Sequence, residues 1–153
     1  MALKPGSPAP DFDGIATDGS PLRLADFRGR KLVLYFYPMD DTPGCTKQAC
    51  SLRDYNAEIA ARGAGIVGVS AQSRESHQRF TEKYRLNFPL LVDTDQHVAK
   101  TYHAAGSGLF GIARGMLGAN ERITYVIDEQ GRIAHVIDDP DCPNHGEEVL
   151  KLL

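Results

Sequence analysis

The chain has 153 residues, of which 42% are hydrophobic and 24% are charged, so it is long enough to bury one core, and we expect a single domain over residues 1–153. Its formal net charge of -3 at pH 7 gives no basic footprint for nucleic acid or for an anionic membrane. No apolar run is long enough for a secretion signal or a membrane span, so we expect a cytoplasmic location. In that compartment, cysteine pairs are more often catalytic, redox-sensing or metal-binding than structural.

The first thirty residues predict an extended start followed by a hairpin. Three prolines among the first ten residues disfavour a helix there. Asp18-Gly19 is a dipeptide typical of a hairpin turn. We expect the side chains of Leu22, Leu24 and Phe27, which follow this turn, to pack against the core.

Residues 32–37 form the most apolar run of the chain, Leu-Val-Leu-Tyr-Phe-Tyr, which predicts a strand buried on both faces. Pro38 ends this strand. Residues 45–62 contain neither proline nor glycine and carry apolar residues at helical spacing, and Gly63 supplies a stop signal. We therefore expect a helix over residues 45–62.

Cys45 falls in the first turn of that helix, after a turn made by Pro43 and Gly44. Free backbone N–H groups and the positive end of the helix dipole favour an anion at this position, and the anion that a cysteine supplies is a thiolate. The pattern therefore predicts a reactive cysteine. The alternative for a single cysteine is a small buried residue of the core.

Cys50 lies five residues further along the same expected helix. In an intact helix the two Cα atoms would be about 8.7 Å apart, whereas a disulfide needs less than about 7 Å. The pair therefore closes only if the first turns of the helix unwind, which favours a switch between two conformations over a permanent staple. The alternative is two unrelated thiols that never meet.

After this helix the chain alternates strands with helices. We expect a buried strand, a helix capped by Ser73 and a short strand over residues 66–70, 74–84 and 88–93. Thr94 or Asp95 is expected to cap a brief helix. Two further strands that a Glu-Gln-Gly turn separates, and a closing helix, are expected over residues 122–128, 132–137 and 146–153. This alternation predicts a layered α/β domain with parallel strands joined by right-handed crossovers.

Residues 104–120 combine five glycines with large apolar residues. Long loops of this kind are often functional or disordered. Two interpretations remain: a loop folded back on the core, or a mobile wall of the substrate pocket or subunit contact.

The segment 37–50, Tyr-Pro-Met-Asp-Asp-Thr-Pro-Gly-Cys-Thr-Lys-Gln-Ala-Cys, resembles the active-site segment of the peroxiredoxins. The second cysteine five residues after the first is similar to the Q-type, or bacterioferritin-comigratory, branch. Further matching stretches lie at residues 3–12, 68–80, 88–93 and 122–128. The resemblance implies a thioredoxin-like fold, an α/β arrangement with a central mixed sheet flanked by helices, and the reduction of hydrogen peroxide and organic hydroperoxides.

The resemblance also implies the roles of the cysteines. Cys45 would be the peroxidatic cysteine, and Cys50 the resolving cysteine that closes an intramolecular disulfide. Thioredoxin or a similar dithiol would reduce this disulfide, and no metal or organic cofactor would be required. We expect a monomer or a weak homodimer.

Cleavage of a peroxide bond builds negative charge on the departing oxygen, so donors are needed beside the sulfur. Thr42 and the backbone N–H groups of Gly44 and Cys45 are suitably placed in the sequence, and we expect Pro38 and Gly44 to line the substrate pocket. By resemblance, the cation of the site is Arg122.

Three further features leave alternatives open. From the residues alone, Arg53 and Arg114 compete with Arg122 for the cationic role. Met39 stands where the family often has lysine. Gln48 stands where it often has glutamate, so the charge balance beside the thiolate changes unless amide hydrogen bonding substitutes.

Cys142 lies in a loop with acidic neighbours, which disfavour a thiolate. It is interpreted first as a bystander thiol, and otherwise as an alternative resolving cysteine or a metal ligand. A zinc-binding module would use Cys45, Cys50, Cys142 and His145. A thiol-disulfide exchanger or redox sensor is a further alternative, which the absence of Cys-x-x-Cys weakens.

Overall fold

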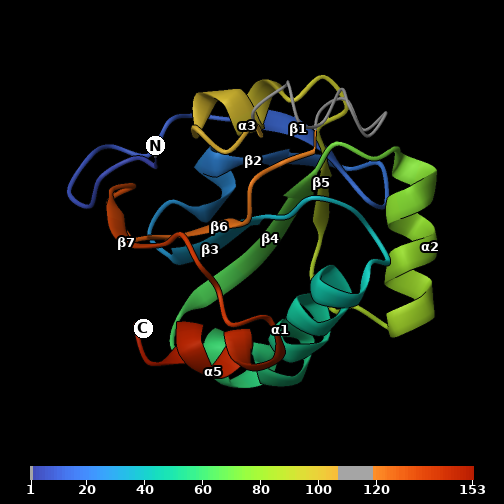
Figure 1. Ribbon diagram of the computed structural model, residues 1–153. Coiled ribbons are helices and arrows are strands. Elements are labelled where there is room, and N and C mark those ends of the chain that lie inside the picture. The colour runs from blue at the N-terminus through green and yellow to red at the C-terminus, as the bar shows by residue number, and fades with distance from the viewer. Residues whose placement is uncertain (1, 107–118) are drawn as a thin grey trace.

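The computed structural model describes residues 2–106 and 119–153, which fold around a mixed sheet (Figure 1). Within these residues the sheet has seven strands in the order β2-β1-β5-β4-β3-β6-β7. The strands are β1 (Asp13–Ala16), β2 (Pro21–Arg23), β3 (Lys31–Phe36), β4 (Ala64–Ser70), β5 (Leu90–Val92), β6 (Ile123–Ile127) and β7 (Ile133–Ile137). Strands β3, β4 and β5 are parallel to one another, and the other pairings are antiparallel.

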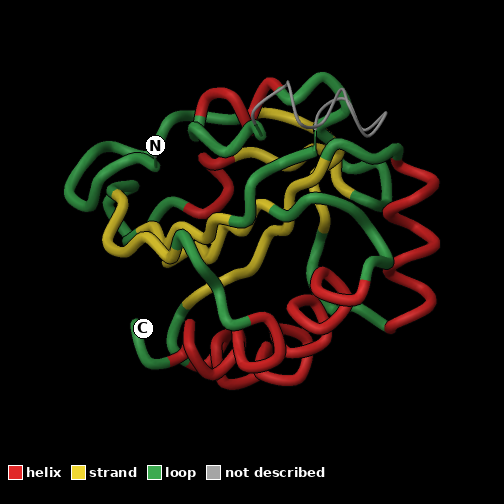
Figure 2. The backbone as a smooth tube through the Cα atoms, in the orientation of Figure 1, coloured by secondary structure: helices red, strands yellow, loops and turns green. Residues whose placement is uncertain are grey.

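Helices cover the two faces of this sheet. Helix α1 (Pro43–Ala61) connects β3 to β4, and α2 (Arg74–Tyr84) connects β4 to β5. Figure 2 shows α1 and α5 (His145–Leu150) on one side of the sheet and α3 (His97–Thr101) on the other. The expected thioredoxin-like arrangement, with a central mixed sheet flanked by helices, is therefore confirmed.

Strand β3 separates two apolar clusters. Val33 and Tyr35 pack with α1 and α2 on one face, whereas Leu34 and Phe36 pack with α3 on the other. All four side chains are fully buried. The continuous apolar run therefore forms a strand buried on both faces, as expected, because successive side chains of a strand point to opposite sides.

The helix ends show where local sequence signals were sufficient. Helix α2 has the expected bounds, and the Ser73 hydroxyl accepts a hydrogen bond from the N–H of Ser76. Helix α1 begins at Pro43, two residues earlier than expected, because proline is well tolerated in the first turn. Gly63 follows α1 with a φ of +79°, a conformation that favours glycine.

The expected cap of α3 is wrong. Gln96 is the N-cap residue, rather than Thr94 or Asp95. The carboxylate of Asp93 accepts from the N–H groups of Val98 and Ala99, at 3.1 and 3.0 Å. Asp93, the residue after β5, therefore accepts the hydrogen bonds that a local cap residue would accept. The closing helix also begins earlier than expected, at His145 after a short 3₁₀ turn over Cys142–Asn144.

The two ends of the glycine-rich segment 104–120 that the structure describes lie next to each other. Ala105 forms an isolated antiparallel bridge with Asn120. Residues 107–118 lie outside the described residues, and so does the interpretation of this segment as a folded loop or a pocket wall. Within the described ranges, no helix is long and apolar enough to cross a membrane.

Candidate active site

Cys45 is the third residue of α1 and belongs to the apolar cluster between this helix and the sheet. Its exposed fraction is 1%, and it packs among Tyr35, Ala49 and Leu52. Helix geometry leaves the N–H groups of Gly44 and Cys45 without an acceptor inside the helix. The sulfur is thus attached to a helix terminus that attracts negative charge.

Arg122 immediately precedes β6, whose first residue, Ile123, pairs with Phe36 at the end of β3. The arginine therefore faces Cys45 in the first turn of α1. Its Nη2 donates to Cys45 Sγ at 3.3 Å, and its Nη1 donates to Gln48 Oε1 at 2.8 Å. A Cβ atom at Gly44 would lie only 3.2 Å from Nη2, so glycine there lets the guanidinium approach the helix closely. Arg122 thus contacts two residues on one face of α1, Cys45 and, one turn further along, Gln48.

Of the two competing arginines, Arg53 does not take this place. Arg53 donates to the Asp54 carboxylate and, at 2.6 Å, to the carbonyl of Tyr84, so its guanidinium is held against the end of α2. Arg114 lies outside the described residues. Among the described residues, the structure brings Arg122 to the sulfur.

Gln48 places an amide at the centre of the site. Its side chain is fully buried, and its oxygen accepts from Arg122. The amide nitrogen has no partner in the part of the chain that the structure describes. The amide therefore orients Arg122 without neutralising it, and the positive charge of the guanidinium remains directed at Cys45.

Thr42 and Pro38 belong to the loop that leads into α1. Thr42 is the N-cap residue, but its hydroxyl donates to the carbonyl of Met39 at 3.2 Å instead of capping the helix. The carbonyl of Pro38 accepts from Gln72 Nε2 at 3.4 Å. In this conformation the Thr42 hydroxyl stabilises the turn before α1.

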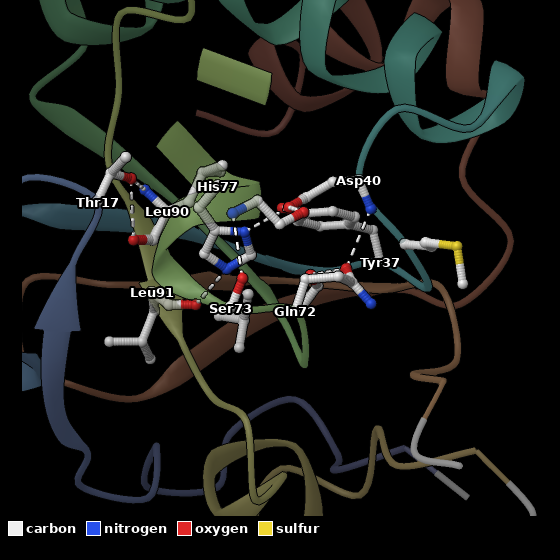
Figure 3. Close-up of polar contacts among 12 residues, drawn as sticks. Thr17, Tyr37, Asp40, Gln72, Ser73, His77, Leu90 and Leu91 are labelled. Atoms are coloured by element: carbon white, nitrogen blue, oxygen red, sulfur yellow. Dashed lines mark hydrogen bonds and ion pairs between the residues drawn. The ribbon is translucent and has the colours of Figure 1, made fainter. Parts of the chain in front are cut away.

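Sequence reasoning missed the polar network that holds this loop. Asp40 is buried, and its carboxylate contacts the Tyr37 hydroxyl, the Ser76 hydroxyl and the ring of His77 (Figure 3). The available signal was the position of His77 three residues before the apolar Phe80, on the buried face of α2. A histidine on that face needs buried partners, although the sequence does not say which.

The three cysteines are free thiols in this structure. Cys45 and Cys50 both lie inside the intact helix α1, so the expected unwinding has not occurred in this conformation. Cys142 lies in the 3₁₀ turn and lines a surface hollow together with Arg122 and Pro140. Burial raises the pKa of the Cys142 thiol; the charge of Arg122 acts in the opposite direction, and acidic groups such as Asp141 raise the pKa further. The net effect disfavours the thiolate, so this thiol is a poor nucleophile at neutral pH.

His145 does not complete a metal site. Its ring nitrogens contact Thr124 Oγ1 at 2.9 Å and Glu148 Oε1 at 2.7 Å. Burial lowers the pKa of His145, although Glu148 acts in the opposite direction. Within residues 2–106 and 119–153, no group of three or more side chains suited to a metal ion is found, so the four zinc ligands considered above are not gathered.

Comparison with known proteins gives the class of this chain: it is a peroxiredoxin, a thiol-dependent peroxidase with a thioredoxin-like fold that acts on peroxides with a thiol reductant. The chain belongs to the AhpC/TSA family, whose model matches residues 5–136. It is 43% identical over 149 residues to the chloroplastic peroxiredoxin Q of Sedum lineare, and this match covers 97% of the chain and 76% of that protein.

Solved structures give the same branch. Peroxidoxin BcpB of Mycobacterium tuberculosis is 33% identical, with a TM-score of 0.88 over 98% of this chain and 96% of that one. A bacterioferritin comigratory protein of Xanthomonas campestris, studied for its alkyl peroxide reduction activity, is 27% identical, with a TM-score of 0.85 over 97% and 96% of the two chains. The expected Q-type branch is therefore confirmed.

Proposed function

We propose that Cys45 is the peroxidatic cysteine, that Cys50 resolves it, and that Arg122 is the catalytic cation. The observation that carries this proposal is the contact of 3.3 Å between Arg122 Nη2 and Cys45 Sγ at the start of α1. An arginine stays protonated at any physiological pH, so it stabilises the thiolate before attack and the departing oxygen during attack.

The cycle has three balanced steps. The Cys45 thiolate attacks the terminal oxygen of a hydroperoxide, the O–O bond breaks, and the sulfur becomes a sulfenic acid. The departing alkoxide or hydroxide takes a proton from solvent and leaves as an alcohol or water. The first turns of α1 unwind, the Cys50 thiol attacks that sulfur, and water leaves as the disulfide forms. An external dithiol then reduces the disulfide and is itself oxidised.

The remaining site residues shape the pocket in this proposal. The N–H groups of Gly44 and Cys45 point toward the space beside the sulfur because they begin the helix. Thr42 offers its hydroxyl to the peroxide after rotating away from the carbonyl of Met39. Pro38 lines the approach and holds the turn through Gln72.

The proposed substrates are hydrogen peroxide and organic hydroperoxides. The alkyl peroxide reduction activity of the Xanthomonas campestris relative supports the second class. The proposed reductant is thioredoxin or a similar dithiol, because the oxidation of the chain by peroxide ends in a disulfide between Cys45 and Cys50, which a dithiol can reduce by exchange. We further propose that residues 1–153 form a single domain that acts in the cytoplasm as a monomer or weak homodimer, with no metal or organic cofactor.

Replacing Cys50 by serine tests the proposed resolving step. The Cys50→Ser chain is expected to consume one equivalent of peroxide, whereas its steady-state turnover with a dithiol reductant falls by about a hundredfold or more, because the sulfenic acid has no neighbouring thiol. Peroxide consumption is followed at one and at ten equivalents, and the Cys45 product is identified by mass spectrometry. Undiminished steady-state turnover in this variant contradicts the proposal.

A further inference from the structure

The buried contact between Asp40 and His77 constrains the protonation of both residues. The ring of His77 has an exposed fraction of 0%, and its Nδ1 lies 2.7 Å from Asp40 Oδ2. Its Nε2 lies 3.1 Å from the carbonyl oxygen of Leu91 (Figure 3). A carbonyl oxygen only accepts hydrogen bonds, so Nε2 carries a proton. A second proton is then shared between Nδ1 and the carboxyl group.

Asp40 makes further hydrogen bonds in the same buried network. Tyr37 donates its hydroxyl to Oδ1 at 2.6 Å, and Ser76 donates its hydroxyl to Oδ2 at 2.8 Å. Burial and then the charge of Asp40 raise the pKa of Tyr37 well above its usual value, so the Tyr37 hydroxyl keeps its proton and remains a donor. With His77, the carboxyl group of Asp40 therefore has three hydrogen-bond partners.

This hydrogen-bond network holds the loop that precedes Cys45. The backbone N–H of Asp40 donates to Gln72 Oε1 at 3.0 Å. The carboxylate of the next residue, Asp41, accepts from Lys83 Nζ at 2.8 Å and from the Tyr84 hydroxyl at 2.6 Å. Asp41 also has a φ of +60°, in the left-handed region that aspartate tolerates better than most non-glycine residues. Two consecutive residues of the loop, Asp40 and Asp41, therefore both bind side chains of α2.

Residues 42–50, which follow this loop, have few side-chain hydrogen bonds. Between Thr42 and Cys50, the side-chain hydrogen bonds of the described structure are that of Thr42 to Met39 and those of Arg122 to Cys45 and Gln48. The next anchor of α1 comes one residue after Cys50, where Ser51 Oγ accepts from the N–H of Gly146 at 2.8 Å. Residues 42–50 therefore lie between two firm attachments.

We propose that Asp40 and His77 are positioning residues that keep residues 38–41 in one conformation while the next residues unwind. We call residues 38–41 the stationary edge of the switch. Asp40 and His77 hold residues 38–41 in place in the reduced and the disulfide forms, so that unwinding is confined to residues 42–50. They also set the position of Cys45 relative to Arg122 for the attack on peroxide. This inference rests on the proposed roles of Cys45 and Cys50, and it adds a role for a pair that touches neither sulfur nor substrate.

Two substitutions of the same histidine test the positioning role. An asparagine amide reaches the place of Nδ1 and keeps a donor for Asp40, whereas a glutamine amide reaches the place of Nε2 and keeps the donor for Leu91. Both remove the ring, and asparagine, which is one methylene shorter, leaves the larger cavity, so a purely structural effect would slow His77→Asn at least as much as His77→Gln. We expect His77→Gln to slow the first consumption of peroxide by about tenfold or more relative to His77→Asn, because small displacements of a nucleophile are costly.

The measurement is the single-turnover rate of peroxide consumption by the reduced protein, a step that precedes any disulfide. Equal slowing in both variants, slowing in neither, or greater slowing in His77→Asn overturns the positioning role. Absence of peroxide consumption by the native chain contradicts the proposed function instead, so the two failures are distinguishable.

Hydrogen exchange in the native chain tests the stationary edge without any variant. We expect the amide of Asp40, which donates to Gln72, to stay protected in both the reduced and the disulfide forms. Amides of residues 44–50 are expected to exchange faster in the disulfide form only. If disulfide formation accelerates exchange at Asp40 as much as at residues 44–50, the stationary edge is wrong.

Discussion

Replacing Cys45 by serine is expected to lower the rate of peroxide reduction by more than about a thousandfold while the fold persists. A serine hydroxyl is not ionised at neutral pH and attacks an O–O bond poorly. The oxygen still fits beside Arg122 Nη2, which donates to Cys45 Sγ at 3.3 Å in the native chain. The rate is measured with hydrogen peroxide and with an alkyl hydroperoxide, and the fold by thermal unfolding.

The matched control for Cys45→Ser is Cys142→Ser. It removes a thiol of the same size from the surface hollow that Arg122 also lines. Because burial and acidic neighbours disfavour a thiolate at Cys142, this control is expected to keep the native rate. A Cys45→Ser protein that retains full peroxidase turnover would remove the basis of the proposed mechanism.

Replacing Arg122 by alanine is expected to lower the rate of the first peroxide step by about a hundredfold or more, the usual effect of losing one donor to a developing negative charge. The loss should appear in the rate of attack and not in the reduction of the disulfide. The variant also leaves Gln48 Oε1 buried without its donor, which costs about 1–3 kcal/mol of folding free energy. Stability and rate are therefore measured on the same samples.

Two further variants separate charge from geometry at this position. Arg122→Lys keeps the cation but loses the planar guanidinium that contacts Cys45 and Gln48 together, so its rate is expected between those of the native and the alanine proteins. Arg53→Ala removes an arginine from the same helix as Cys45, where it contacts Asp54 and Tyr84, and is expected to keep the native rate. A rate in Arg122→Ala within twofold of the native rate would contradict the catalytic role.

Local signals were sufficient for the elements that position Cys45. The apolar run before Pro38 predicted a doubly buried strand, and β3 is one. The absence of glycine and proline before Gly63 predicted the long helix α1, and Ser73 predicted the start of α2. These features depend on neighbouring residues in the chain, which is why the sequence carries them.

Contacts between distant parts of the chain were not predictable in the same way. The cap of α3 comes from Asp93, whose carboxylate reaches over residues 94–97, so a search for a local cap selected the wrong residue. The partners of His77 lie on the loop after β3 and on β5, 37 and 14 residues away. Arg122 could be placed at the sulfur only by family resemblance, because the pairing of β6 with β3 brings it there.

The central claim is that Cys45 and Cys50, held apart in the intact helix α1, form the disulfide of the cycle. The measurement that tests it most directly is the mass-mapped disulfide connectivity of the fully reduced chain after one equivalent of hydrogen peroxide. The predicted result is a bond between Cys45 and Cys50, formed within seconds, with Cys142 still a free thiol. Three unchanged thiols, or a bond from Cys45 to Cys142 with Cys50 free, would contradict the account.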